Sequence, residues 1–170
     1  MQVDFYKYSQ SVSPVEKFGI VDPDDKNGKR SAYVSYDSEG EKWNATVECN
    51  NRQDYSFIAV DNNIPLTVKI DGKDETASTC DAMLYTPKTV CFIELKEYKK
   101  GGGWLLRAVE QLESTIRFFG NEIEKYENKR AYVCNTRRPF TPTSHKIVQQ
   151  QFLQKNKVLL RIKTEIDELK

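Results

Sequence analysis

The sequence lacks the features that mark several common classes of protein. It has one histidine, His145, and its four cysteines form no Cys-x-x-Cys pair, which argues against a structural zinc site. No apolar stretch approaches the ~20 residues of a membrane span. Residues 1–7 lack the basic start and apolar core of a signal peptide. We therefore expect a cytoplasmic protein with buried, reduced thiols and a surface-exposed His145.

Length and composition are those of one ordinary globular domain. The chain has 170 residues, of which 38% are hydrophobic and 30% charged. Its net charge of +1 hides an asymmetry, because residues 1–124 carry 15 Lys or Arg against 21 Asp or Glu (−6), while residues 125–170 carry 11 against 4 (+7). A basic flank of this kind suits a polyanion such as nucleic acid, and it equally suits a solvated face.

The strongest chemical pattern lies in residues 79–98. Thr89 to Leu95 is a short apolar run rich in β-forming residues, which predicts a strand buried on both faces. Because side chains alternate along a strand, Glu94 and Lys96 share one face, and Ile93 and Leu95 point the other way. The sequence thus predicts that the oppositely charged side chains of Glu94 and Lys96 lie next to each other at the end of a core strand.

A second strand is predicted just upstream, from Cys80 to Tyr85, with a turn at Thr86-Pro87-Lys88. If the loop holds an even number of residues, for example Thr86 to Thr89, Asp81 lies opposite Glu94 on the same face. An odd loop without a bulge would place the two acids on opposite faces. In the even case a divalent cation could bridge the two carboxylates.

Asp81, followed after twelve residues by Glu94-Leu95-Lys96, resembles the active-site signature of the PD-(D/E)xK nuclease superfamily. The chain departs from that motif at residue 80, which is Cys rather than Pro. Gln111-Leu112, on a predicted helix, resembles the glutamine motif of RecB-like members, although Thr115 stands where those members often carry Tyr. The resemblance covers roughly residues 64–135.

The resemblance implies a nuclease that uses magnesium, with manganese as an alternative metal, to hydrolyse phosphodiester bonds. By analogy with the family we expect DNA as the substrate, and the sequence leaves RNA open. Asp81, Glu94 and the backbone carbonyl of Leu95 would hold the metal. Lys96 would orient or activate water, and Gln111 would hold an active-site residue or water. The sequence leaves open a homodimer and a partner protein.

A further acid is expected, because the PD-(D/E)xK core usually begins with a helix that supplies one. No convincing helix precedes Ile64 in this chain. The candidates for that acid are Glu16, on a plausible helical turn, and Glu48 and Asp61, on predicted strands.

Two alternatives to the nuclease remain at this point. One is a non-catalytic module on the same fold that binds nucleic acid or protein, in which Asp81, Glu94 and Lys96 form a cross-strand ion pair. The other is a sensor or inhibitor that docks another protein through its β-rich N-terminal half, with Tyr33, Tyr36 and Trp43 as anchors.

The fold class predicted is α/β (α+β), with a mixed central β-sheet, flanking helices and a restriction-endonuclease-like core. Residues 1–63 are predicted to be a β-rich N-terminal extension, and residues 64–170 a nuclease-like core in the same domain. The apolar stripe of residues 104–126 predicts a long helix packed on the sheet. The other expected elements are a helix at 144–154 and strands at 31–36, 43–49, 55–61, 64–70, 130–135 and 157–166, the strand at 130–135 running parallel to the Glu94 strand.

Overall fold

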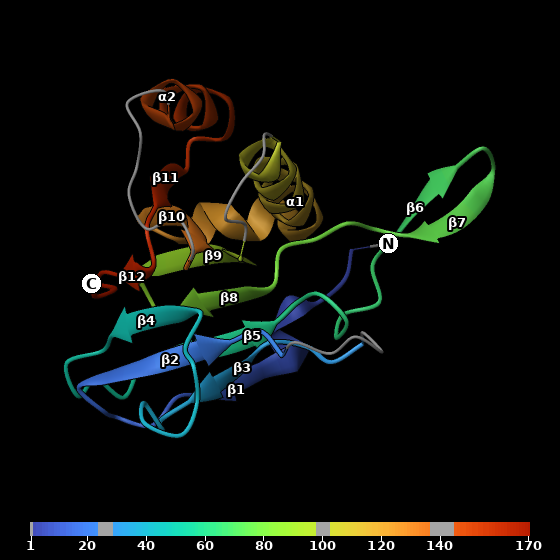
Figure 1. The fold of residues 1–170 in the computed structure, drawn as a ribbon. Coiled ribbons are helices and arrows are strands. Elements are labelled where there is room, and N and C mark those ends of the chain that lie inside the picture. Colours follow the sequence, from blue (N-terminus) through green and yellow to red (C-terminus); the bar gives the residue numbers. More distant parts are fainter. Residues whose placement is uncertain (1, 24–28, 98–102, 137–144) are drawn as a thin grey trace.

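The structure is a computed structural model that describes residues 2–23, 29–97, 103–136 and 145–170. Within these residues the chain forms mixed β-sheets with two α-helices, so the predicted α+β class is confirmed (Figure 1). No helix among the described residues is long and apolar enough to cross a membrane.

The first half of the chain contributes η1 (Phe5–Tyr8), β1 (Ser9–Ser11), β2 (Lys17–Val21), β3 (Tyr33–Ser35), β4 (Ala45–Glu48), β5 (Ser56–Ala59), β6 (Thr67–Ile70), β7 (Lys73–Thr76) and β8 (Ala82–Tyr85). The second half contributes β9 (Thr89–Lys96), α1 (Trp104–Phe119), η2 (Gly120–Lys125), β10 (Asn128–Asn135), α2 (His145–Asn156), β11 (Leu159–Ile162) and β12 (Glu165–Ile166).

The central sheet has six strands in the order β1-β5-β8-β9-β10-β11. Along this order β1, β5, β8 and β9 pair antiparallel, and β9, β10 and β11 pair parallel. Parallel neighbours need a crossover connection, and α1 and α2 occupy the two crossovers. The predicted parallel pairing of the strand after α1 with the Glu94 strand is therefore confirmed.

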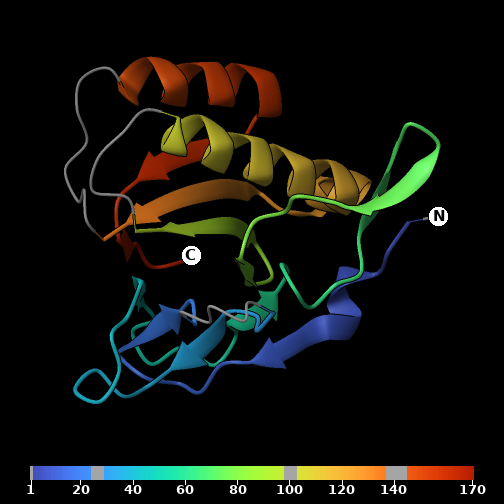
Figure 2. The same ribbon diagram turned by 45° about the vertical axis from the view of Figure 1, so that its right-hand side comes forward.

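The molecule has three layers, because both faces of the central sheet are covered. Alternate side chains of β9 enter different cores: Val90 and Phe92 pack with residues of α1, whereas Cys91 and Ile93 pack with residues of the second sheet. That second sheet has four strands in the order β12-β4-β2-β3. Figure 2 shows the two helices on one side of the central sheet and the second sheet on the other.

The predicted division between residues 63 and 64 does not follow the sheets. β1 and β5, from the N-terminal part, lie in the central sheet beside β8, and β12, from the C-terminal end, joins β4 in the second sheet. The N-terminal part is therefore not a separate layer added to a core, because hydrogen-bonded strand pairs from both parts build both sheets.

Several predicted elements differ in extent from the structure. The helix predicted to Tyr126 ends at Phe119, where Gly120 takes a positive φ of 64°, and continues as a 3-10 helix. The strand predicted at residues 157–166 is two strands in different sheets, β11 and β12. β2 was not predicted from the sequence, because Gly19 weakens the strand pattern. The same glycine allows Trp43 to pack where a Cβ atom would lie 2.1 Å from its ring.

The strand predicted at residues 64–70 is the shorter strand β6. It forms a hairpin with β7, a strand that was not predicted from the sequence. Asp71 and Gly72 connect the two strands with φ values of 50° and 78°, as a tight two-residue turn requires. Leu66 and Ala77 are buried at its base, and Ala77 N donates to Leu66 O over 2.9 Å. From there the hairpin projects away from the three layers (Figures 1 and 2).

Candidate active site

The β8–β9 hairpin places the two acids of the predicted motif opposite one another. Tyr85 pairs with Val90 and Ala82 with Ile93, so the loop from Thr86 to Thr89 holds four residues. This even length is the case in which Asp81 is expected to lie opposite Glu94 on the same face. Continuing that register by one residue sets Asp81 opposite Glu94, and Asp81 Oδ2 accepts a hydrogen bond from Leu95 N over 2.7 Å.

Lys96 lies between the acid pair and helix α1. Its Nζ is 3.0 Å from Glu94 Oε1 and donates to Gln111 Oε1 over 2.7 Å. Gln111 also donates from Nε2 to the carbonyl of Thr79 over 3.3 Å. The glutamine therefore connects the lysine on β9 with the segment that leads into Asp81, and Asp81, Glu94, Lys96 and Gln111 form one cluster.

Thr115 makes a second connection between α1 and this segment. One turn after Gln111, its hydroxyl donates to Gln111 O over 3.0 Å and accepts from Cys80 N over 2.8 Å. Thr115 and Cys80 are both fully buried. This role of Thr115 could not be predicted from the sequence, because the partner of its hydroxyl lies 35 residues upstream.

Burial and neighbouring acids raise the pKa of both carboxyl groups. Burial is the main cause for Asp81, whose pKa rises to about 7, followed by the charge of Asp22. Burial, and then the charge of Asp81, raise the pKa of Glu94 well above its ordinary value, while Lys96 opposes the rise. The folded chain therefore disfavours full ionisation of the pair, which a cation would favour.

Asp61 is the upstream acid candidate that the fold brings near the pair. Its charge raises the pKa of both Asp81 and Glu94, and its backbone N donates to Cys80 O over 3.2 Å. Glu48 instead pairs with Lys17 in the second sheet. Glu16 lies in a bend before β2, so the helical turn predicted for it is wrong.

Asp22 was not among the residues predicted from the sequence. It follows directly after β2, the strand whose glycine obscured the pattern, and an acid after a buried strand was the signal that could have found it. Asp22 also lines a polar cavity of about 340 Å³ together with Arg30, Lys42 and Glu97. Arg30 and Lys42 bring two cationic side chains to this cavity, next to the end of β9, and Lys42 donates to Glu97 over 2.9 Å.

The chemistry of these residues fits a hard divalent cation. Glu94 is 1% exposed, and its Oε2 is buried without a hydrogen-bond partner in the part of the chain described. Carboxylate oxygens are the donors that Mg²⁺ prefers, and Leu95 lies between the two motif residues of β9. Residues 2–23, 29–97, 103–136 and 145–170 contain no group of three or more His, Cys, Asp or Glu side chains placed to hold a metal ion. Any metal would thus depend on two carboxylates plus backbone and water oxygens.

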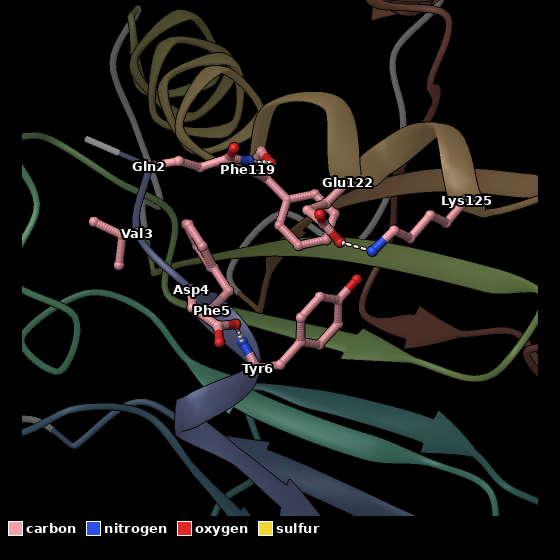
Figure 3. Close-up of a pocket in the computed structure, with 8 residues that line it drawn as sticks. All are labelled: Gln2, Val3, Asp4, Phe5, Tyr6, Phe119, Glu122 and Lys125. Carbon is pink, nitrogen blue, oxygen red and sulfur yellow. Dashed lines mark hydrogen bonds and ion pairs between the residues drawn. The ribbon is translucent and has the colours of Figure 1, made fainter.

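A different hollow lies at the C-terminal end of α1 (Figure 3). It measures about 350 Å³, and its charged side chains are already engaged: Glu122 pairs with Lys125, and Asp4 accepts from Tyr6 N over 3.0 Å. The phenol of Tyr6 has a pKa raised by burial and by its hydrogen bond with Tyr126. These contacts offer neither a nucleophile nor a metal ligand set.

The remaining sequence predictions have mixed outcomes. All four cysteines are buried free thiols, as predicted. His145, expected at the surface, is partly exposed, and its ring packs edge-on against Trp104 with 5.8 Å between ring centroids.

Comparisons of this chain with protein-family models, with curated proteins and with solved structures found no match.

Proposed function

We propose that this chain is a magnesium-dependent nuclease that hydrolyses phosphodiester bonds in DNA. The observation that supports this most is the buried pairing of Asp81 with Glu94, with Lys96 held 3.0 Å from Glu94 and hydrogen-bonded to Gln111. Burial disfavours ionisation of both acids at once, and the lysine beside them is held in position. Such a combination is typical of a site that binds a cation and an anionic substrate. The arrangement matches the motif by which the sequence resembles PD-(D/E)xK nucleases.

Each residue of the cluster has a role in this proposal. Asp81, Glu94 and the carbonyl of Leu95 would hold Mg²⁺ or Mn²⁺, which when bound supplies positive charge to the scissile phosphate and lowers the pKa of water. Lys96 orients water and stabilises negative charge at the phosphate. Gln111 fixes the Lys96 ammonium through its 2.7 Å hydrogen bond. Asp61 adds negative charge to the same site.

The alternative is a non-catalytic module that binds nucleic acid or protein. One observation favours it: Lys96 already makes an ion pair with Glu94, as a purely structural cross-strand pair would. In that case neither a metal nor catalysis is needed to explain the cluster. The two proposals differ in their response to metal and to substitution.

The deciding experiment measures cleavage of supercoiled plasmid, and of labelled DNA and RNA strands, in Mg²⁺, Mn²⁺ or EDTA. We expect cleavage of DNA that EDTA abolishes and that Glu94→Gln and Lys96→Met each reduce by about 10²- to 10³-fold. The matched controls are Glu122→Gln and Lys125→Met, which change the Glu–Lys pair of the hollow in Figure 3 and should leave the rate unchanged. Absence of cleavage together with absence of calorimetric metal binding would contradict the nuclease and favour the binding module.

A further inference from the structure

The β6–β7 hairpin is a two-stranded ribbon without a core of its own. All eight residues of its strands are exposed, and it projects from the molecule in both views of the fold (Figures 1 and 2). An isolated two-stranded hairpin is marginally stable in water. The ribbon also interrupts what could have been a short connection between β5 and β8, which pair directly. Such an insertion is best explained by a contact outside the chain.

The two faces of the ribbon differ in character. The register pairs Val68 with Glu75 and Ile70 with Lys73, so these four side chains share one face. Val68 is 38% exposed and Ile70 is 54% exposed. We call these four residues the ribbon face. The opposite face is polar, and on it Lys69 pairs with Asp74 over 2.9 Å.

The charges of the ribbon argue against nucleic acid as its partner. From Thr67 to Thr76 the segment has two lysines against three acids, a balance of −1. A polyanion would meet a surface that is not attractive overall, and Lys69 is already paired. The mixed apolar and charged composition of the ribbon face instead suits another protein.

The ribbon face is complementary to itself. Two copies can stack with their ribbon faces against each other, related by a two-fold axis that lies between the faces and runs perpendicular to the strands. This rotation places Val68 of one copy over Ile70 of the other. The same rotation places Glu75 over Lys73 twice, so apolar meets apolar and each acid meets a lysine. We propose that this protein forms a homodimer in which two ribbon faces stack in this way.

The size of the ribbon sets the expected strength of the dimer. Four side chains per copy cover much less than the ~800 Å² per partner of a standard interface. We therefore expect a reversible dimer with a dissociation constant in the micromolar range. The proposal does not depend on nuclease activity, because it rests on the exposure and the register of β6 and β7.

The test is charge reversal on the full-length chain, measured by sedimentation velocity across a concentration series. Lys73→Glu alone and Glu75→Lys alone each oppose like charges across the two-fold axis, and we expect each to weaken the dimer at least about tenfold. The double variant Lys73→Glu/Glu75→Lys restores the pairing and should dimerise as the wild type does. Mixing the two single variants should produce a heterodimer, because each copy then presents the charges that the other needs.

The matched control is Lys69→Glu, a charge reversal on the opposite face of the same ribbon, which should leave the dimer intact. A wild-type chain that stays monomeric at every concentration would overturn the proposal. The proposal would also be overturned if Lys73→Glu, Glu75→Lys and Lys69→Glu all weakened the dimer equally. That result would show an effect of net charge rather than of the ribbon face. Loss of DNA binding in the single variants without any change in dimerisation would assign the ribbon to nucleic acid instead.

Discussion

Two Glu–Lys ion pairs lie near helix α1 and show how burial changes the meaning of the same chemistry. In one, Lys96 and Glu94 have side chains 12% and 2% exposed, and both are held by β9. In the other, Lys125 and Glu122 have side chains 65% and 31% exposed, on the 3-10 helix after α1. Water screens the second pair, whereas the first lies among the acids Asp61 and Asp81 with little solvent.

Formation of an ion pair therefore does not by itself mark a functional site. An exposed ion pair contributes about 0 to 1 kcal/mol, because water solvates its charges nearly as well as the partner does. A buried charge cannot be solvated in that way, so its neighbours determine its pKa. The pKa of Glu94 rises despite the adjacent lysine because burial and Asp81 outweigh Lys96.

The largest effect on stability is expected from removing the buried cation. Lys96→Met leaves Glu94 without its counter-charge, and we expect the free energy of unfolding to fall by about 3 kcal/mol. Lys125→Met should cause no measurable change, because that ammonium is exposed. Urea denaturation followed by circular dichroism measures both. Equal small changes would mean that burial does not separate the two pairs.

A smaller effect is expected from the threonine that connects α1 to the acid pair. Thr115→Val keeps the shape but leaves Cys80 N buried without an acceptor, which should lower the free energy of unfolding by about 2 kcal/mol. Thr115→Ser keeps the hydroxyl and should cost about half as much. The same denaturation measurement compares them. If valine were as well tolerated as serine, the hydrogen bond to Cys80 would not be important for holding this segment.

The smallest effect is the gain in stability from the proposed metal. At a Mg²⁺ concentration ten times its dissociation constant, the folded chain should gain about 1.4 kcal/mol, seen as a rise in melting temperature. Asp81→Asn should abolish this rise. The metal-free variant should nevertheless melt above the metal-free wild type, if both are measured above the pKa of about 7 at Asp81.

The sign of that second expectation follows from linkage. The pKa of Asp81 is raised on folding, so the folded chain holds its proton more tightly than the unfolded chain, and stability falls as pH rises from about 4 to about 7. An uncharged asparagine avoids that loss. Asp54→Asn is the control with the opposite sign, because the hydrogen bond from Arg52 lowers the pKa of Asp54. A metal-free Asp81→Asn variant that melts below wild type would contradict the raised pKa.

Much of the site could be predicted because it depends on local rules. Strand alternation places Glu94 and Lys96 on one face, and the four-residue loop sets Asp81 opposite Glu94. The apolar spacing of residues 104–126 predicts a helix against the same sheet, with Gln111 at the edge of its stripe, and α1 covers residues 104–119 of that range. Each of these relations spans a few residues or one hairpin.

Other features arise only in the folded molecule, because they join segments far apart in the chain. The charges of Asp22 and Asp61 reach Asp81 from the segments that follow β2 and β5, two strands in different sheets. Residues 157–166 divide between two sheets because β10 and β4 each offer a free edge for pairing, which no local pattern encodes. Local sequence is enough to specify which charges share a strand and a face, because side chains alternate along a strand with a period of two residues. Only the packing of three layers decided which further acids surround them and how little water reaches them, and those two quantities set their pKa values.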